Sequence, residues 1–86
     1  MDYYFFTFRS ITRAQLALRY LQAADVRAAL LRTPKALATE GCGYVIRVRA
    51  ADAAAADQLF SENQVRYQRR FIQRSGRYQE VLHGLS

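Results

Sequence analysis

In the segment GYVIRVR, residues 43–49, apolar and charged side chains alternate from Ile46 onward, as they do in a strand with only one buried face. Its apolar side consists of Tyr44, Ile46 and Val48, and the opposite side carries Arg47 and Arg49. Burying an arginine without a partner is costly, so the apolar side must be the one that packs against helices. This alternation predicts a sheet with one helix-covered face and one face that carries charge.

Other segments supply the remaining strands and the helices. Strands are expected at residues 2–8, 26–32, 43–49 and 65–74, and helices at residues 12–24 and 52–63. Thr12 and Gln15 have the spacing of a capping box at the first helix, and Asp52 can cap the second. Thr33-Pro34 ends the second strand, because proline has no N–H to donate to the ladder. The order is therefore strand, helix, strand, strand, helix, strand.

This order predicts an α+β fold of the ferredoxin-like split β-α-β-β-α-β type, with two helices on one face of an antiparallel sheet. The apolar positions expected to face that sheet are Ala14, Ala17, Leu18, Leu21, Ala24, Ala56, Leu59 and Phe60. Residues 1–75 would form a single domain. Residues 76–86 would be a tail, in which residues 77–82 return as a short hairpin strand after the Ser75-Gly76 turn.

Alternation along the other strands predicts what the uncovered face carries. Val65, Tyr67 and Phe71 are expected to point toward the helices, and Arg69 interrupts this pattern, which indicates a bulge or an exposed strand end. If Tyr4, Phe6 and Phe8 face the helices, Tyr3 and Phe5 lie on the uncovered face. The arginines expected on the uncovered face are Arg27, Arg47, Arg49, Arg66 and Arg70. They form the predicted basic binding face.

The overall charge favours acidic partners. The net charge is +6, and all but one of the 13 basic residues are arginine. A basic surface favours nucleic acid, an acidic protein face or an anionic small molecule. The alternative is that the arginines reflect the coding bias of a GC-rich genome. The basic face would then be a solvated surface or the contact of a homodimer.

Residues 40–47, EGCGYVIR, overlap part of the strand signature of RNA-recognition motifs. Gly41, Gly43, Tyr44 and Val45 fit that signature, but Cys42 stands where a stacking aromatic is required. Tyr44 is also expected on the helix-covered side, where its ring could not stack on a base. Nucleic-acid binding is therefore the least favoured alternative.

Cys42 is the only cysteine of the chain, and it lies between Gly41 and Gly43. One cysteine excludes an internal disulfide, which is typical of a reducing compartment, and a cytoplasmic location is expected. The only histidine, His83, lies far along the chain, so neither a hydrolytic Cys-His site nor a metal site is predicted. Lys35 could favour the thiolate form of Cys42, whereas Glu40 would oppose it.

Several short motifs resemble the Se/S carrier-like family of small bacterial proteins. The matching residues are Thr7, Phe8, Thr33, Pro34, Leu37, Cys42 and Gly43, and the resemblance covers about residues 2–72. It implies that Cys42 accepts sulfur or selenium and passes it between proteins. It also implies that Thr33, Pro34, Gly41 and Gly43 shape the loop that carries this thiol.

Three hypotheses follow for the function. The first is a sulfur or selenium carrier that uses Cys42, with protein donors and acceptors, no cofactor and no metal. The second is a binding or dimerisation module that uses the basic face, and the third is nucleic-acid binding by the same face. A carrier or binding protein is expected rather than a true enzyme. No apolar run is long enough for a membrane span.

Overall fold

A computed structural model describes residues 2–38 and 43–82, and it confirms the predicted fold class. The strands are β1 (Tyr3–Phe8), β2 (Ala28–Arg32), β3 (Tyr44–Arg49), β4 (Arg70–Arg74) and β5 (Arg77–Glu80). The α-helices are α1 (Ile11–Ala23) and α2 (Ala53–Glu62), and short 3₁₀ helices are η1 (Lys35–Leu37) and η2 (Ala50–Asp52). The strands form one antiparallel sheet in the order β2-β3-β1-β4-β5.

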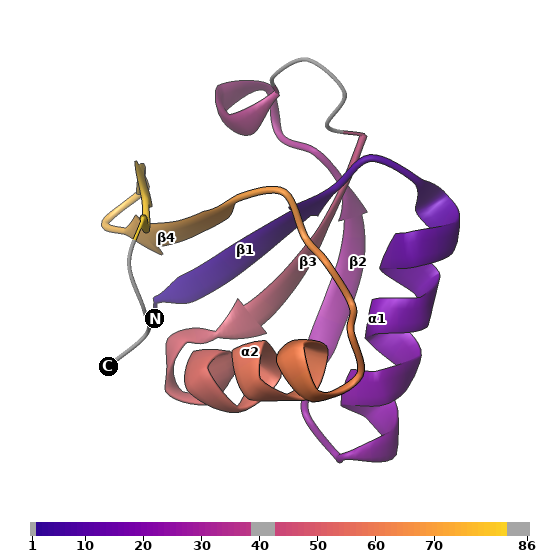
Figure 1. Ribbon diagram of the computed structural model, residues 1–86. Helices are drawn as coiled ribbons and strands as arrows, with labels where there is room; N and C mark the ends of the chain where they lie inside the picture. The colour runs from indigo at the N-terminus through magenta and orange to yellow at the C-terminus, as the bar shows by residue number, and fades with distance from the viewer. Residues whose placement is uncertain (1, 39–42, 83–86) are drawn as a thin grey trace.

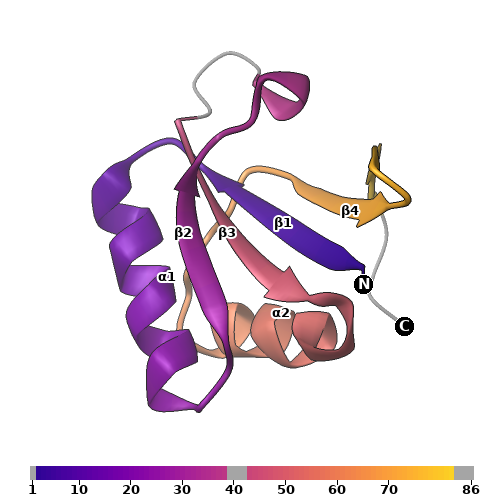
Figure 2. The same ribbon diagram turned by 180° about the vertical axis from the view of Figure 1, so that it is seen from behind.

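Both α-helices cover the same face of the sheet, as the alternation in residues 43–49 predicts (Figure 1). Phe6, Phe8, Ile46 and Val48 are almost fully buried there, and Phe60 of α2 packs edge-on against Phe6 with ring centroids 5.1 Å apart. The half-turned view in Figure 2 shows the opposite face of the sheet. The helix-covered face therefore holds the main core. The predicted assignment of side chains to the two faces of the sheet is confirmed for β1, β2 and β3.

The start of α1 differs from the sequence prediction. The N-cap is Ser10, whose Oγ accepts a hydrogen bond from the Arg13 N–H at 3.1 Å. The capping box predicted at Thr12 and Gln15 is therefore wrong, because the helix already begins at Ile11. A serine in an extended conformation can accept a hydrogen bond from a free N–H of the first turn, so Ser10 takes the capping role predicted for Thr12. Ala24, predicted in the core, is exposed at the C-cap.

Helix α2 starts where Asp52 predicts it, but the Asp52 side chain does not cap the helix N–H groups. Its carboxylate instead pairs with Arg49, with Oδ2 3.2 Å from an arginine nitrogen. Ala53, Ala56 and Phe60 are buried as the inward face of the helix. The pair links the end of β3 to α2 through η2.

The segment before β4 contains a β-bulge, which changes the face of the sheet to which each β4 side chain points. The Thr7 N–H donates to the Arg69 carbonyl at 2.9 Å, whereas the Thr7 carbonyl accepts from the Gln68 N–H at 2.8 Å. Two residues of one strand thus lie opposite one residue of β1, which defines a bulge. The Arg69 N–H donates to Thr7 Oγ1 at 3.0 Å and fixes the extra residue. Strand β4 accordingly begins only at Arg70.

The shift reverses the predicted orientation of every β4 side chain. Phe71, predicted under the helices, lies on the opposite face, and Arg70, predicted on that opposite face, lies on the helix side next to Tyr67. A single inserted residue moves a whole strand from one face to the other, because side chains alternate with a period of two. Val65 and Tyr67 precede the bulge and pack on the helix side as predicted.

The face opposite the helices is half covered. Leu37 of η1, only 1% exposed, packs with Phe5, Val45 and Phe71. Tyr78 of β5 adds an edge-on contact to Phe5, with ring centroids 5.4 Å apart. Ser75 and Gly76 both have positive φ, the geometry of the tight turn that joins β4 and β5. The predicted hairpin strand is therefore present, and it covers part of the second face.

Candidate functional site

The described residues on either side of the segment of Cys42 lie where β1 and β2 end and β3 begins. Cys42 and Gly41, two of the predicted site residues, lie outside the described residues. Gly43 is described, and its N–H donates to the Phe8 carbonyl at 3.2 Å. Its carbonyl accepts from the Thr33 N–H, also at 3.2 Å. Gly43 therefore joins the end of β1 to the residue that follows β2.

The other side of this loop is held by Thr33, Pro34 and η1. Pro34 precedes η1, and its carbonyl accepts from the Leu37 N–H at 2.9 Å. The Leu37 side chain packs into the second core, which is the cluster with Phe5, Val45 and Phe71 on the sheet face opposite the helices. The Thr33 hydroxyl is buried and has no hydrogen-bond partner among residues 2–38 and 43–82. The structure thus brings together three of the predicted loop-shaping residues, Thr33, Pro34 and Gly43.

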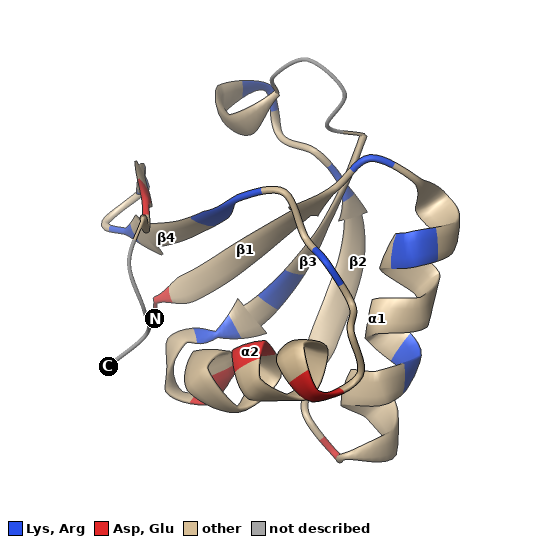
Figure 3. Cartoon of the chain, in the orientation of Figure 1, with Lys and Arg blue, Asp and Glu red and all other residues tan. Residues whose placement is uncertain are grey.

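The surroundings of these anchors are cationic. Arg9 follows β1 directly, Arg32 ends β2, and Lys35 begins η1. Lys and Arg gather around η1 and the β1–α1 connection in Figure 3, and residues 30–38 contain no acidic side chain. Arg32 also contacts the Tyr44 ring, with its guanidinium carbon 5.7 Å from the centroid. The described residues that flank the segment of Cys42 therefore carry positive charge.

A second cluster lies on the sheet face opposite the helices, around Tyr3. Arg27, Arg47 and Arg49 line one hollow of about 370 Å³, together with Tyr3, Ala28 and Ala29. The Arg47 guanidinium lies over the Tyr3 ring, 4.7 Å from its centroid. We call this feature the arginine hollow. It unites three of the five arginines that were predicted to form one basic face.

The other two arginines of that prediction lie elsewhere. Arg70 is on the helix side, because the bulge at Gln68 and Arg69 reverses β4. Arg66 precedes the bulge and lines a larger hollow with Arg13 and Leu16 of α1. Their predicted place on the uncovered face is therefore wrong, and the basic surface there is smaller than the sequence indicates.

Arg70 belongs to a polar cluster that sequence reasoning missed. It is 8% exposed, and its Nη1 lies 3.6 Å from Asp57 Oδ2. The Tyr67 hydroxyl donates to Asp57 Oδ1 at 2.6 Å, and the Arg70 guanidinium carbon lies 5.7 Å from the Tyr67 ring centroid. Burial raises the pKa of Tyr67 above its ordinary value, and the hydrogen bond to Asp57 raises it further. The cluster links α2 to the bulge and to β4.

The raised pKa of Tyr67 predicts a loss of stability at high pH. In the unfolded chain Tyr67 ionises near pH 10, whereas in the folded protein it keeps its proton to a higher pH. Its contribution to the free energy of unfolding is complete below pH 10 and falls as pH rises from there toward the raised pKa. Denaturant unfolding between about pH 9 and pH 11 should therefore show a steeper decline for the wild type than for Tyr67→Phe. Equal slopes would contradict this assignment.

Within residues 2–38 and 43–82, no group of three or more His, Cys, Asp or Glu side chains could hold a metal ion. No helix in this part of the chain has both the length and the apolar character that crossing a bilayer requires.

The fold, together with the hydrogen bonds that hold Gly43 to Phe8 and Thr33, defines the class of protein. It is a small split-βαβ domain whose β2–β3 loop carries a single cysteine and is pinned at both ends to the sheet. Residues 3–71 match the model of the family described as "Putative Se/S carrier protein-like", and the chain belongs to that family. This match confirms the resemblance seen in the sequence. Neither the curated proteins nor the solved structures include a match to the chain.

Proposed function

We propose that the protein carries sulfur or selenium between proteins as a persulfide, or its selenium equivalent, on Cys42. Membership of the Se/S carrier-like family carries this proposal, together with the presence of a single cysteine in the chain. A second cysteine nearby could attack the persulfide, form a disulfide and release the sulfur, so a lone thiol suits a carrier.

The transfer needs no net oxidation. The Cys42 thiolate attacks the outer sulfur of a donor persulfide, and a sulfur–sulfur bond forms as the donor's own sulfur–sulfur bond breaks. The donor cysteine leaves as a thiolate. The same exchange in reverse, with an acceptor thiolate as the attacking group, unloads the carrier. A selenium atom bound to a donor cysteine sulfur would move by the same displacement.

The loop anchors support this chemistry. Backbone hydrogen bonds from Gly43 to Phe8 and Thr33 hold the residue after Cys42 against the sheet. Arg9, Arg32 and Lys35 stand on the segments next to these anchors, and cations lower the pKa of a nearby thiol. A thiolate populated near neutral pH is the form that attacks a persulfide.

A loading experiment tests the proposal. The protein is incubated with a cysteine desulfurase and cysteine, and its intact mass is then measured under non-reducing conditions. We expect a gain of one sulfur atom, which a reductant removes and which peptide mapping places on Cys42. A mass that stays unchanged after incubation would contradict the carrier function. Desulfurase without cysteine is the control.

A second candidate is a protein-binding module that acts through the arginine hollow, with Cys42 as an ordinary structural residue. The observation that favours it is the convergence of Arg27, Arg47 and Arg49 on one side of the sheet. The homodimer expected from the sequence would use the same face, and sedimentation velocity tests it.

A further inference from the structure

The arginine hollow holds more positive charge than its surroundings neutralise. Three arginines line it, and none of its six lining residues is acidic. Arg49 is paired with Asp52, whereas the described residues provide no ion pair for Arg27 or Arg47. Three guanidinium groups and one carboxylate leave a local charge of +2. Guanidinium groups that converge in this way suit a carboxylate or a phosphate, which they bind through paired hydrogen bonds.

Strand pairing explains why the hollow exists. Ala29 on β2 pairs with Arg47 on β3, and Tyr3 on β1 pairs with Arg49. Alanine leaves open space beside the long Arg47 side chain, while the Tyr3 ring supports its guanidinium from the other side. Arg47 is therefore held in place, and its free side faces β2.

The hollow opens toward an edge of the sheet. β2 is the last strand on its side, so one row of its N–H and C=O groups has no neighbouring strand among the described residues. Leu31 is 36% exposed on the same face as Ala29. An edge strand with these properties can accept a further strand from another chain. A side chain of that added strand next to Ala29 would reach across the small alanine to Arg47.

We propose that the β2 edge and the arginine hollow together bind an extended acidic segment of a partner protein. The segment pairs its backbone with Ala28–Arg32, and alternate acidic side chains enter the hollow. Charge complementarity selects the partner, and backbone pairing adds affinity. The inference does not depend on Cys42 and can hold whether or not the protein carries sulfur.

Two other occupants fit less well. A single-stranded nucleic acid needs free aromatic faces, but Arg47 covers the Tyr3 ring, and Phe5 is only 3% exposed. A second copy paired through β2 would supply no acidic side chain, because Ala28–Arg32 contains none, and it would add a second arginine hollow to the same face of the sheet. Like charges on neighbouring strands repel, so self-pairing is disfavoured.

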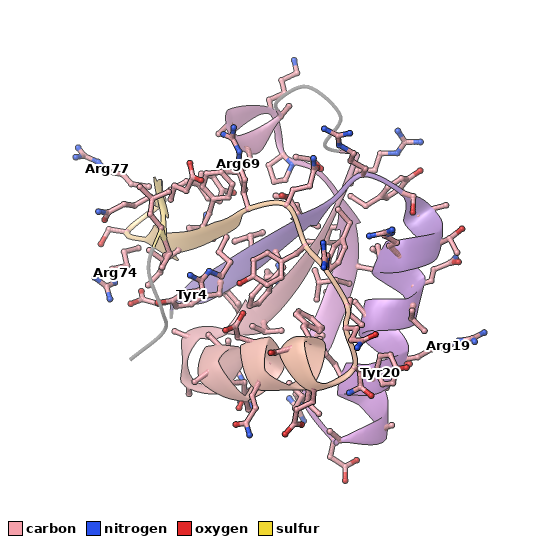
Figure 4. All side chains as sticks on the ribbon, in the orientation of Figure 1. Tyr4, Arg19, Tyr20, Arg69, Arg74 and Arg77 are labelled. Atoms are coloured by element: carbon pink, nitrogen blue, oxygen red, sulfur yellow. The ribbon has the colours of Figure 1, made fainter. Side chains whose placement is uncertain are left out.

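The test uses a short fluorescent peptide in which Val and Glu alternate, and follows its anisotropy during titration with the whole protein. An Arg27→Glu/Arg47→Glu variant should weaken binding at least about tenfold. The matched control is Arg19→Glu/Arg77→Glu, which changes the charge equally at two arginines that point away from the molecule (Figure 4). This control should bind within about twofold of the wild type. Hydrogen exchange in the complex should slow at Ala28–Arg32.

Several results would overturn the proposal. A peptide of the same composition with its Glu residues grouped at one end should bind weakly, and equal binding would show attraction by charge alone. If the Arg19→Glu/Arg77→Glu control loses as much binding as the Arg27→Glu/Arg47→Glu variant, the attraction is again one of overall charge alone. A single-stranded RNA that binds more tightly than the peptide would assign the hollow to nucleic acid. If no binding is seen at about 1 mM peptide, the proposed peptide site is rejected. If the glutamate variant fails to fold, Arg27→Gln/Arg47→Gln serves in its place.

Discussion

A Cys42→Ser variant is expected to pass no sulfur from a donor persulfide to an acceptor thiol. Serine keeps the size of the side chain, but its hydroxyl is not ionised near neutral pH and forms no persulfide. Transfer followed with labelled cysteine and a desulfurase should fall at least roughly a hundredfold, to the rate without carrier. Circular dichroism should show an unchanged fold, because serine is close to cysteine in size.

The control for this experiment is Gly43→Ala, one residue away. A Cβ placed at Gly43 would lie 3.6 Å from the Arg9 carbonyl oxygen, an ordinary van der Waals distance, and apart from the adjacent residues no other heavy atom of the described part of the chain lies within 4 Å. The two backbone hydrogen bonds of Gly43 do not need a glycine, so the anchor should survive. We expect this variant to keep most of its transfer rate. If Cys42→Ser transfers sulfur as fast as Gly43→Ala does, the thiol is not the carrier group.

Local patterns predicted the elements that carry strong periodicity. Ile46 and Val48 alternate with Arg47 and Arg49, and this pattern alone assigned the two faces of β3 correctly. Strand order followed from the succession of strands and helices, since the split βαβ arrangement is among the few that short connections allow. These features depend on neighbours in the sequence, and such neighbours are visible without a structure.

The features that were missed depend on residues far apart in the sequence. The bulge at Gln68 and Arg69 is fixed by hydrogen bonds to Thr7, 62 positions before Arg69. No local pattern reveals that partner, although Arg69 did interrupt the alternation. The consequence was an Arg70 placed on the wrong face, where its pairing with Asp57 could not be foreseen. Leu37 was similarly read as part of a loop, whereas η1 turns its side chain into the second core.

The candidate site divides in the same way. Thr33, Pro34 and Gly43 were expected to shape one loop, and hydrogen bonds place Thr33 and Gly43 together where the strands end. Arg27, Arg47 and Arg49 were expected on one face, and they line one hollow. Arg66 and Arg70 were counted with them because a regular strand was assumed from residue 65 onward. The predicted side-chain orientations agree with the structure where strand pairing is regular and differ from it beyond the bulge.

An Asp57→Ala variant is expected to lower the free energy of unfolding by about 2–3 kcal/mol, since Asp57 binds both Tyr67 and the buried Arg70. The loss stays below the roughly 3–5 kcal/mol of a fully buried pair, because the Asp57 side chain is 33% exposed. For a domain of this size, that corresponds to a fall in Tm of about 10–20 °C, which calorimetry measures.

The matched control is Asp52→Ala, which removes the carboxylate of another Asp–Arg pair. There the Arg49 side chain is 47% exposed, whereas that of Arg70 is 9% exposed, so water can replace the lost partner. We expect Asp52→Ala to cost less than about 1 kcal/mol. Adding Arg70→Met to Asp57→Ala should restore part of the lost stability, because it removes the buried charge that the missing carboxylate neutralised. Equal costs for the two alanine variants would mean that the Asp57 cluster does not hold α2 to the bulged strand. The bulge would then depend on its other contacts, such as the Thr7 hydrogen bonds and the ion pair between Arg69 and Glu80.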